Sequence, residues 1–502
     1  MKNKLNLGSR IKHVHFIGIG GISMSGLAEI LHRDGYKVSG SDWTGSDITK
    51  HLASQGINVR LGNSSDHITD DIDLMVYTAA VKPDNPEFVA ARQKNIPVMD
   101  RAKLLGIIME GYPYSIAISG VHGKTTTTAI VAEMLLKANL DPTISIGGFM
   151  GAIGSNFRIG GSPYLVVEAC EYFDSFLQFH PFIGVILNID SDHLDYFGTL
   201  ERLVDSFHRF GQNIRPEGTL VIHKDTPFFD EVTAGLKCNI VTYGGAASGG
   251  AASGGASSAG ASSAGANNIT GKKACFWPKD IQFNENGLPS FSIMDSDRVM
   301  DSDKIIDSDK SLGKITLQLR GCHNIDNALA AVAVASALDI PIEPAIKGIS
   351  QASGAKRRFE HKGTFNDLTI VDDYAHHPTE IKASLAAACG THKRIICAFQ
   401  SHTYSRTQNL LEDFSAAFNH ADIVLILPIY AAREVSTGPY PNYLAERLTE
   451  GICNNGTKAF FMDDFPTAAS WLKKNGQEGD LLITMGAGDI HLLGEGLLAG
   501  VL

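Results

Sequence analysis

The stretch SIAISGVHGKTTTT, residues 115–128, joins a short apolar run, a glycine-rich turn and the beginning of a helical pattern. Glycines at 120 and 123 let successive backbone N–H groups face one anion. Lys124 supplies a positive charge for the β- and γ-phosphates of a nucleotide, and the Thr125 hydroxyl can ligate Mg²⁺. The order strand, phosphate loop, helix predicts an α/β fold with an ATP site.

The loop is shorter than the common phosphate-binding form, because Ile118 stands at the position of the first glycine. A tight turn with a surface lysine is the alternative interpretation. The strand before the loop and the helix after it favour ATP binding. The loop residues expected to contact ATP are Gly120, Val121, His122, Gly123, Lys124, Thr125 and Thr126.

The run SGVHGKTTTT, with His122 before the Gly-Lys pair, resembles the Mur ligases of bacterial cell-wall synthesis and, more distantly, the folylpolyglutamate synthases. Both are ATP-dependent amide-forming enzymes. The resemblance covers essentially the whole chain except about residues 244–312. It implies a three-domain architecture: a Rossmann-like UDP-binding domain over residues 1–111, a central P-loop ATPase-like domain with a mainly parallel sheet over 112–355, and a Rossmann-like α/β domain over 356–502.

Composition agrees with such an enzyme. The 502 residues suggest about three domains at ~150 residues each, and 44% hydrophobic with 19% charged residues is typical of globular proteins. A net charge of −11 argues against binding to nucleic acid or to an anionic membrane. Seven cysteines without a C-x-x-C indicate a reducing cytosol with mostly buried thiols. The N-terminal apolar run is too short for a signal peptide, so we expect a cytoplasmic protein.

The N-terminal segment HVHFIGIGG, residues 13–21, predicts a buried strand that ends in glycines, followed by a helix beginning near Ile22. The spacing Gly18-x-Gly20-x-x-Ser23, with an acid about 20 residues on, is close to the dinucleotide-binding fingerprint. It predicts a diphosphate on the helix N-terminus. NAD and a UDP-sugar both carry a diphosphate, so this motif alone does not separate them.

Three segments resemble the UDP-binding domain of the alanine-adding Mur ligases: GIGGISMSGLAEIL, GSD at 40–42 and YTAAVKPDNPE at 77–87. By this resemblance the UDP diphosphate is held without any nicotinamide. A nicotinamide-dependent oxidoreductase is the alternative from a different class, but nothing downstream offers a hydride-transfer site. The residues implied in UDP-sugar binding are Gly18, Gly20, Gly21, Ser23 and Asp42.

Polar residues follow two strands of the central domain. The strand at 164–167 delivers Glu168, and the apolar run 182–189 delivers Asn188, Asp190, Asp192 and His193. Ligands of α/β folds bind at such strand ends, and beside Thr125 these side chains would form a Mg²⁺ cradle. Capping of strand ends is the alternative, which we favour for Asp190 and Asp195.

The matching Mur segments, E-A-x-E-x-x-x-S-F and N-I-x-x-D-H-x-D, imply that Glu168 and His193 ligate magnesium together with Thr125. Cys170, Tyr172 and Phe173 depart from the family pattern around those ligands. In the apolar helix expected over 321–338, the family's H-N-x-x-N-A-x-A-A segment implies that Asn324 and Asn327 contact adenine. Helix capping is the alternative for both asparagines.

Two segments of biased composition lie in the central domain. Residues 246–266 contain only Ala, Ser and Gly, which predicts a flexible tether whose replacement by a few Gly-Ser residues changes little. Residues 294–310 repeat DSD every six residues, and we favour a solvated repeat expansion over a Ca²⁺ loop. The surrounding apolar residues over 275–319 predict a small antiparallel extension of the central domain.

The C-terminal third alternates strands with helical segments, which predicts a second open α/β sheet. KRRFE, DDYAHHPTE, YSRT, YAARE and GAGDI resemble segments of the alanine-adding Mur ligases. The resemblance implies that Arg358 reaches the ATP phosphates, that Asp373, Tyr374 and His376 line the reaction site, and that Arg406 holds a carboxylate or phosphate. Thr403 departs from relatives that carry a second arginine there. For the paired histidines we favour phosphate or substrate contact over a metal.

The resemblance, together with these residues, implies an ATP- and Mg²⁺-dependent ligase that joins UDP-N-acetylmuramate to L-alanine through an acyl phosphate. Lys124, His376 and Arg406 are the expected catalytic residues, with His376 a candidate base. A murein-peptide recycling ligase that adds a whole peptide to the same acceptor is the nearer alternative. We expect a monomer or a weak dimer.

Overall fold

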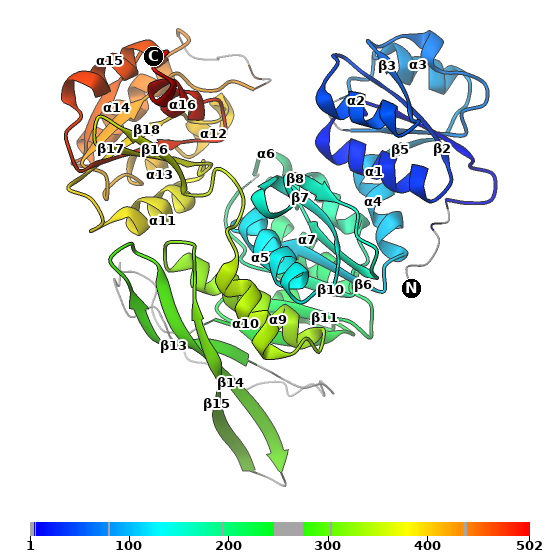
Figure 1. Cartoon of the computed structure of the whole chain (residues 1–502), viewed down its shortest axis with the longest axis horizontal. Coiled ribbons are helices and arrows are strands. Elements are labelled where there is room, and N and C mark those ends of the chain that lie inside the picture. The colour runs from blue at the N-terminus through cyan, green and yellow to red at the C-terminus, as the bar shows by residue number, and fades with distance from the viewer. Residues whose placement is uncertain are drawn as a thin grey trace. The chain divides into compact units, whose positions relative to one another are not determined.

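The computed structural model describes residues 5, 7–78, 81–192, 194–244, 275–301, 304–432, 434 and 439–502. The chain divides into two compact units, and each contains parallel sheets covered by helices (Figure 1). The first unit comprises residues 1–280, 291–315 and 326–353. The second comprises residues 281–290, 316–325 and 354–502.

The N-terminal part of the first unit is a parallel sheet in the order β3-β2-β1-β4-β5. Crossover helices join its strands, as parallel pairing requires. As expected, the first helix begins at Ile22 and the second strand ends at Asp42. The elements are β1 (His13–Ile17), α1 (Ile22–Arg33), β2 (Lys37–Asp42), α2 (Asp47–Ser54), β3 (Asn58–Leu61), η1 (Ser65–His67), β4 (Leu74–Tyr77), α3 (Pro86–Gln93), β5 (Val98–Asp100) and α4 (Arg101–Glu110).

The central sheet has ten strands in the order β15-β14-β13-β12-β11-β10-β6-β9-β7-β8. Its middle is parallel, and the edge strand β8 pairs with β7 in the antiparallel direction. The middle strands are apolar throughout because helices cover them. The elements are β6 (Tyr114–Ser119), α5 (Lys124–Lys137), β7 (Thr143–Met150), η2 (Gly151–Ile153), β8 (Ser155–Arg158), β9 (Tyr164–Glu168), η3 (Tyr172–Gln178), β10 (Ile183–Ile186), α6 (Leu194–Phe197), α7 (Leu200–Gln212), β11 (Thr219–His223), α8 (Phe229–Thr233), β12 (Asn239–Tyr243), α9 (His323–Ala337) and α10 (Ile342–Gln351).

Three further strands lengthen this sheet: β13 (Cys275–Phe283), β14 (Pro289–Asp301) and β15 (Lys304–Thr316). β13 pairs with β12 in parallel, and a turn at residues 284–288 leads into β14. The predicted extension is therefore present as a continuation of the central sheet, but its first strand joins that sheet in the parallel direction and not in the expected antiparallel one. The tract 246–266 lies outside the described residues.

The DSD repeats fall largely on two strands, and the expectation of a solvated expansion in preference to a Ca²⁺ loop stays a prediction. Residues 294–301 belong to β14, and residues 304–310 belong to β15.

The second unit is a six-stranded sheet in the order β16-β17-β21-β18-β19-β20, parallel except for the edge strand β16. Separate apolar clusters cover its two faces. The elements are β16 (Glu360–Phe365), β17 (Leu368–Asp373), α11 (Pro378–Ala388), β18 (Arg394–Phe399), α12 (Tyr404–Asn409), α13 (Leu411–Ser415), β19 (Ile423–Ile426), α14 (Tyr443–Asn454), β20 (Lys458–Phe461), α15 (Phe465–Asn475), β21 (Asp480–Met485) and α16 (His491–Ala499).

Two general expectations can be compared with this fold. Among the described residues, the structure has no helix with the length and apolar character needed to span a membrane. All seven cysteines are free, but only Cys238 and Cys397 are buried, so the expectation of mostly buried thiols is wrong. The exposed cysteines lie in loops or near helix ends rather than on apolar faces. They are Cys170, Cys322, Cys389 and Cys453.

Candidate active site

The phosphate loop connects β6 to α5, as the sequence predicts. Gly120 has a φ of +131° and Gly123 a φ of +81°, conformations that L side chains rarely adopt. A Cβ on Gly123 would also come within 2.8 Å of Asn327 Oδ1. These two positions therefore require glycine. The loop leads directly into the N-terminus of α5, where an anion is favoured.

Lys124 lies at the first position of α5 and is largely enclosed. Its Nζ donates hydrogen bonds to Gly120 O at 2.6 Å and Val121 O at 2.9 Å, and it forms an ion pair with Glu171 Oε2 at 2.9 Å. Burial alone would lower the pKa of Lys124, but the Glu171 carboxylate outweighs it, so the pKa is raised. The lysine therefore carries a positive charge at the loop. Glu171 was not among the predicted site residues.

Thr125 and Glu168 meet at the carboxyl end of β9. The Thr125 hydroxyl donates to Glu168 Oε1 at 3.0 Å, and Gly147 N donates to Glu168 Oε2 at 2.7 Å. A hydroxyl and a carboxylate beside a phosphate loop are the oxygen donors that Mg²⁺ prefers. These two side chains fit a magnesium site, and the third predicted ligand, His193, lies outside the described residues.

The residues that follow β10 also hydrogen-bond to the phosphate loop. His122 N donates to Asn188 Oδ1 at 2.8 Å, and Asn188 Nδ2 donates back to His122 O at 3.0 Å. His122 Nε2 lies 3.1 Å from Asp190 Oδ2. Asp190 does accept a local bond from Ser191 N, as capping predicts, but it also contacts the phosphate loop across 68 residues of sequence.

The two asparagines near the start of α9 differ in their contacts. Asn327 Oδ1 accepts a hydrogen bond from Thr127 Oγ1 of α5 at 3.0 Å, so Asn327 lies beside the phosphate loop. Asn324 Nδ2 donates to Arg320 O at 2.6 Å in the turn that precedes the helix. The contact of Asn324 is local and is not a helix cap, because its amide donates to a preceding carbonyl, whereas that of Asn327 places it at the nucleotide loop.

The N-terminal glycine loop is held by the end of β2. The amides of Gly18 and Ile19 both donate to Ser41 O, at 2.8 and 2.9 Å, and Gly20 N donates to Asp42 Oδ2 at 2.8 Å. A Cβ on Gly20 would come within 2.8 Å of that same carboxylate oxygen. Asp42 thus shapes the loop directly. Gly21 is the N-cap residue of α1, and Ser23 is half-buried in its first turn.

In the second unit, Asp373 ends β17 and is buried. It accepts hydrogen bonds from Ala375 N at 2.8 Å, Ser384 Oγ at 2.8 Å and Phe359 N at 3.1 Å. Burial raises the pKa of Asp373, although Arg358 opposes this. The Arg358 guanidinium lies 5.3 Å from the centre of the Tyr374 ring, a cation–π contact.

His376 follows on the same loop. Its Nδ1 lies 3.0 Å from Tyr374 O, and its backbone N donates to Glu380 Oε2 at 3.1 Å. The pKa of His376 is lowered to about 4, mainly by burial, while Glu380 opposes this shift and Arg406 adds to it. The imidazole is therefore neutral at physiological pH. The adjacent His377 instead caps α11 by accepting from Thr379 N, which separates the roles of the two histidines.

His402 and Tyr430 extend this edge of the sheet and were missed by the sequence analysis. The rings of His376 and His402 lie 6.3 Å apart, and His402 stacks on Tyr430 at 5.7 Å. Arg406 lies in α12. Thr403, which stands where some relatives carry a second arginine, is the N-cap residue of this helix. Both missed residues follow apolar strands in QSH and YAARE, a position that could have indicated them. Arg433 of YAARE lies outside the described residues.

The three parts of the chain match three family models. The Mur ligase family catalytic domain matches residues 13–113, the Mur ligase middle domain matches 118–335, and the Mur ligase glutamate ligase domain matches 357–488. The chain belongs to the Mur ligase family. It has the three-domain α/β architecture of that family, and the prediction that it is a ligase is confirmed. The boundaries at residues 111 and 355 stay a prediction.

Individual Mur ligases are similar to this chain over nearly its whole length. The UDP-N-acetylmuramate–L-alanine ligase of Acetivibrio thermocellus is 46% identical over 490 residues, 97% of this chain and 96% of that protein. The enzyme of the same name from Clostridium novyi is 45% identical over 485 residues, 96% of each. The structure of the UDP-N-acetylmuramate–alanine ligase of Thermotoga maritima has a TM-score of 0.71 at 24% identity, covering 97% of this chain and 99% of that one.

The pKa of His376 gives this Mur ligase a testable pH dependence. Between about 4 and the ordinary value of 6.5, the unfolded chain binds a proton at this histidine that the folded chain does not. The free energy of unfolding should therefore fall as pH falls through this window. When the pH is lowered from about 7 to about 5, we expect the melting temperature of His376→Gln to fall by less than that of the unmodified chain.

Differential scanning calorimetry at both pH values measures this difference. His180→Gln is the matched control, because His180 is exposed on the first unit. An equal drop in melting temperature for His376→Gln and the unmodified chain would contradict the assignment of a half-buried, neutral imidazole.

Proposed function

We propose that this chain joins L-alanine to the lactyl carboxylate of UDP-N-acetylmuramate at the expense of ATP, in peptidoglycan precursor synthesis. The observation that carries the proposal is the 46% identity to an alanine-adding relative over 97% of the chain. The phosphate loop and the N-terminal glycine loop supply separate sites suited to a triphosphate and a diphosphate.

The reaction needs an activated carboxylate, since a free carboxylate is a poor electrophile. The lactyl carboxylate attacks the γ-phosphate of ATP and gives an acyl phosphate with release of ADP. The amine of alanine then attacks the acyl carbon, and phosphate leaves from the tetrahedral intermediate. Positioning and charge neutralisation account for most of the acceleration in such phosphoryl transfer.

The charged side chains have distinct proposed tasks. Lys124, whose positive charge is retained beside Glu171, neutralises the transferring phosphate. Arg358 contacts the ATP phosphates, and Arg406 holds a carboxylate or the phosphate. His376 is neutral at physiological pH and can accept the proton that the alanine ammonium must lose, although a pKa of about 4 makes it a weak base.

Magnesium is the implied metal. Thr125 and Glu168, which meet at 3.0 Å, would hold it together with His193. When bound, Mg²⁺ supplies positive charge that offsets the charge of the ATP phosphates. Asn327 beside the loop, with Asn324, would contact the adenine.

The proposal is tested by phosphate release with UDP-N-acetylmuramate, ATP and each candidate amine. We expect L-alanine to be used fastest, with glycine and L-serine slower but detectable. A pocket closed around a methyl group rejects larger amines by clash, whereas a missing methyl is worth only ~1–3 kcal/mol.

Two outcomes would replace the proposal. Preference for L-Ala-γ-D-Glu-diaminopimelate over free alanine would assign the chain to murein-peptide recycling. Calorimetric binding of NAD, with no response to UDP-N-acetylmuramate, would favour the oxidoreductase alternative.

A further inference from the structure

A fully buried carboxylate lies beneath the N-terminal sheet and has no role in the proposed reaction. Glu87, near the start of α3, is 0% exposed. Its Oε2 lies 3.0 Å from His15 Nε2 and accepts a hydrogen bond from Ser41 Oγ at 2.7 Å. Its Oε1 lies 2.9 Å from His67 Nδ1 and 3.3 Å from Ser64 N, which donates to it.

These four contacts match the capacity of an ionised carboxylate, which accepts at both oxygens. Burial would raise the pKa of Glu87, but hydrogen bonds from His15, Ser41 and His67 outweigh burial, so the pKa is lowered. A buried charge costs stability unless hydrogen bonds satisfy it, and here every carboxylate lone-pair direction has a partner. Such a group fixes the positions of the donors around it.

One of those donors connects Glu87 to the diphosphate loop. The Ser41 hydroxyl bonds to Glu87, while the Ser41 carbonyl accepts the amides of Gly18 at 2.8 Å and Ile19 at 2.9 Å. The next residue, Asp42, accepts Gly20 N at 2.8 Å. The end of β2 therefore sets the path of the loop, and Glu87 sets the position of the end of β2.

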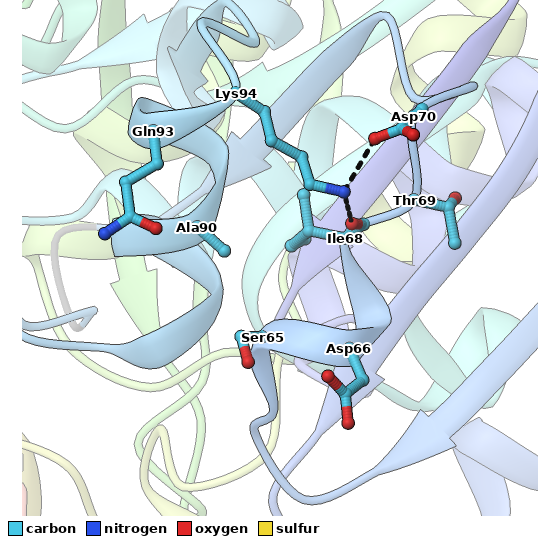
Figure 2. A pocket seen from close by; sticks show the side chains of 8 residues that line it. All are labelled: Ser65, Asp66, Ile68, Thr69, Asp70, Ala90, Gln93 and Lys94. Carbon is cyan, nitrogen blue, oxygen red and sulfur yellow. Dashed lines mark hydrogen bonds and ion pairs between the residues drawn. The ribbon is translucent and has the colours of Figure 1, made fainter.

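The elements that carry Glu87 and His67 are also fastened to each other. Lys94, just after α3, donates to Ile68 O and to Asp70 Oδ1, both at 2.7 Å (Figure 2). Figure 2 shows this lysine spanning from the end of α3 to the segment after η1. The surface hollow between these elements is lined by Lys94 and its neighbours and contains none of the predicted site residues. The hydrogen bonds of Lys94 thus connect α3, which carries Glu87, to the segment next to His67.

We propose that Glu87 is a positioning residue for UDP-sugar binding. Through Ser41, the Glu87 carboxylate holds the glycine loop in the conformation that leaves the N-terminus of α1 facing a diphosphate. This inference rests on the proposed function, in which UDP-N-acetylmuramate is the acceptor. It assigns Glu87 no contact with the substrate.

The test compares Glu87→Gln and Ser41→Ala with the unmodified chain in steady-state ligation. A glutamine has one acceptor oxygen in place of two, and an alanine removes the connecting hydroxyl. We expect both variants to raise the KM for UDP-N-acetylmuramate by roughly tenfold, the size expected when a hydrogen bond to a charged group is lost. The KM for ATP should change less than about twofold, because the phosphate loop lies in another sheet.

Asp73→Asn is the matched control. Asp73 accepts the amides of Lys12 and His13 at 2.8 and 2.9 Å, at the opposite end of β1 from the glycine loop. This carboxylate-to-amide change should leave the KM for the UDP-sugar near that of the unmodified chain. Calorimetric binding of UDP gives a second readout and should weaken in Glu87→Gln and Ser41→Ala only.

The outcomes separate the two proposals. If the unmodified chain does not bind UDP-N-acetylmuramate, the proposed function itself is wrong, and the inference that rests on it is rejected with it. If it binds normally and folded Ser41→Ala shows an unchanged KM for the UDP-sugar, Glu87 has only a structural role. An equal rise in the KM for ATP would also overturn the inference, since a general loss of stability does not distinguish the substrates.

Discussion

Lys124→Ala should lower the rate of ligation at least about a hundredfold, the loss expected when a fixed group that stabilises transition-state charge is removed. The Lys124 ammonium lies at the start of α5 with its positive charge retained, and the phosphate loop bends around it. Phosphate release under saturating ATP measures the effect. Calorimetric binding of UDP-N-acetylmuramate should be preserved, because its proposed loop lies in the other sheet of the first unit.

Loss of stability must be separated from loss of catalysis in this variant. Removing Lys124 leaves the buried Glu171 carboxylate without its ion pair, which is itself destabilising. The double variant Lys124→Ala, Glu171→Gln should recover melting temperature without recovering activity. Lys137→Ala, at the last position of the same helix, is the control and should ligate normally. Near-normal turnover in Lys124→Ala would remove the central premise of the ATP site.

The sequence was sufficient to locate this loop because each part of it is a local requirement. The short apolar run at 116–118, followed by a glycine-rich turn, favours a buried strand, and the structure has β6 there. Gly120 and Gly123 have left-handed φ values that few other residues adopt. The same reasoning located the glycine loop that follows β1 and the polar ends of β9 and β17.

Contacts between residues that are distant in sequence were harder to predict from the sequence. Glu171 was visible as the second acid of E-A-C-E, but its ion pair with Lys124 depends on β9 pairing beside β6. Likewise, the stacking of His402 on Tyr430 depends on β18 pairing beside β19. Strand order is set by the whole sheet, so no local pattern indicates these partners.

The contacts of Glu87 are a second example of what local sequence patterns do not indicate. YTAAVKPDNPE was matched to the family only as a string, and the structure shows that its Asn85 caps α3, which begins at Pro86. The four donors around the carboxylate come from β1, β2 and the segment at η1. A lone glutamate at a helix N-terminus is ordinarily an exposed partner of the helix dipole, so its burial was not evident.

Phe276→Ala should destabilise the chain by ~3–5 kcal/mol, the usual cost of removing a buried phenylalanine. Phe276 is 1% exposed and lies on β13, at the position that pairs with Tyr243 of β12. Phe283, at the end of the same strand, is 48% exposed. Phe283→Ala is therefore a matched control and should cost less than about 1 kcal/mol.

Urea unfolding followed by circular dichroism measures both variants. A large difference between them is expected if β13 is an integral strand of the central sheet. A third variant, in which a few Gly-Ser residues replace 246–266, should match the unmodified chain, because lengthening or shortening a loop changes its closure cost only by about 0.6 kcal/mol per doubling. If Phe276→Ala is as mild as Phe283→Ala, the extension contributes little to the stability of the ATP-binding sheet. Loss of ligation on replacing the tract would instead reveal a role that its composition does not indicate.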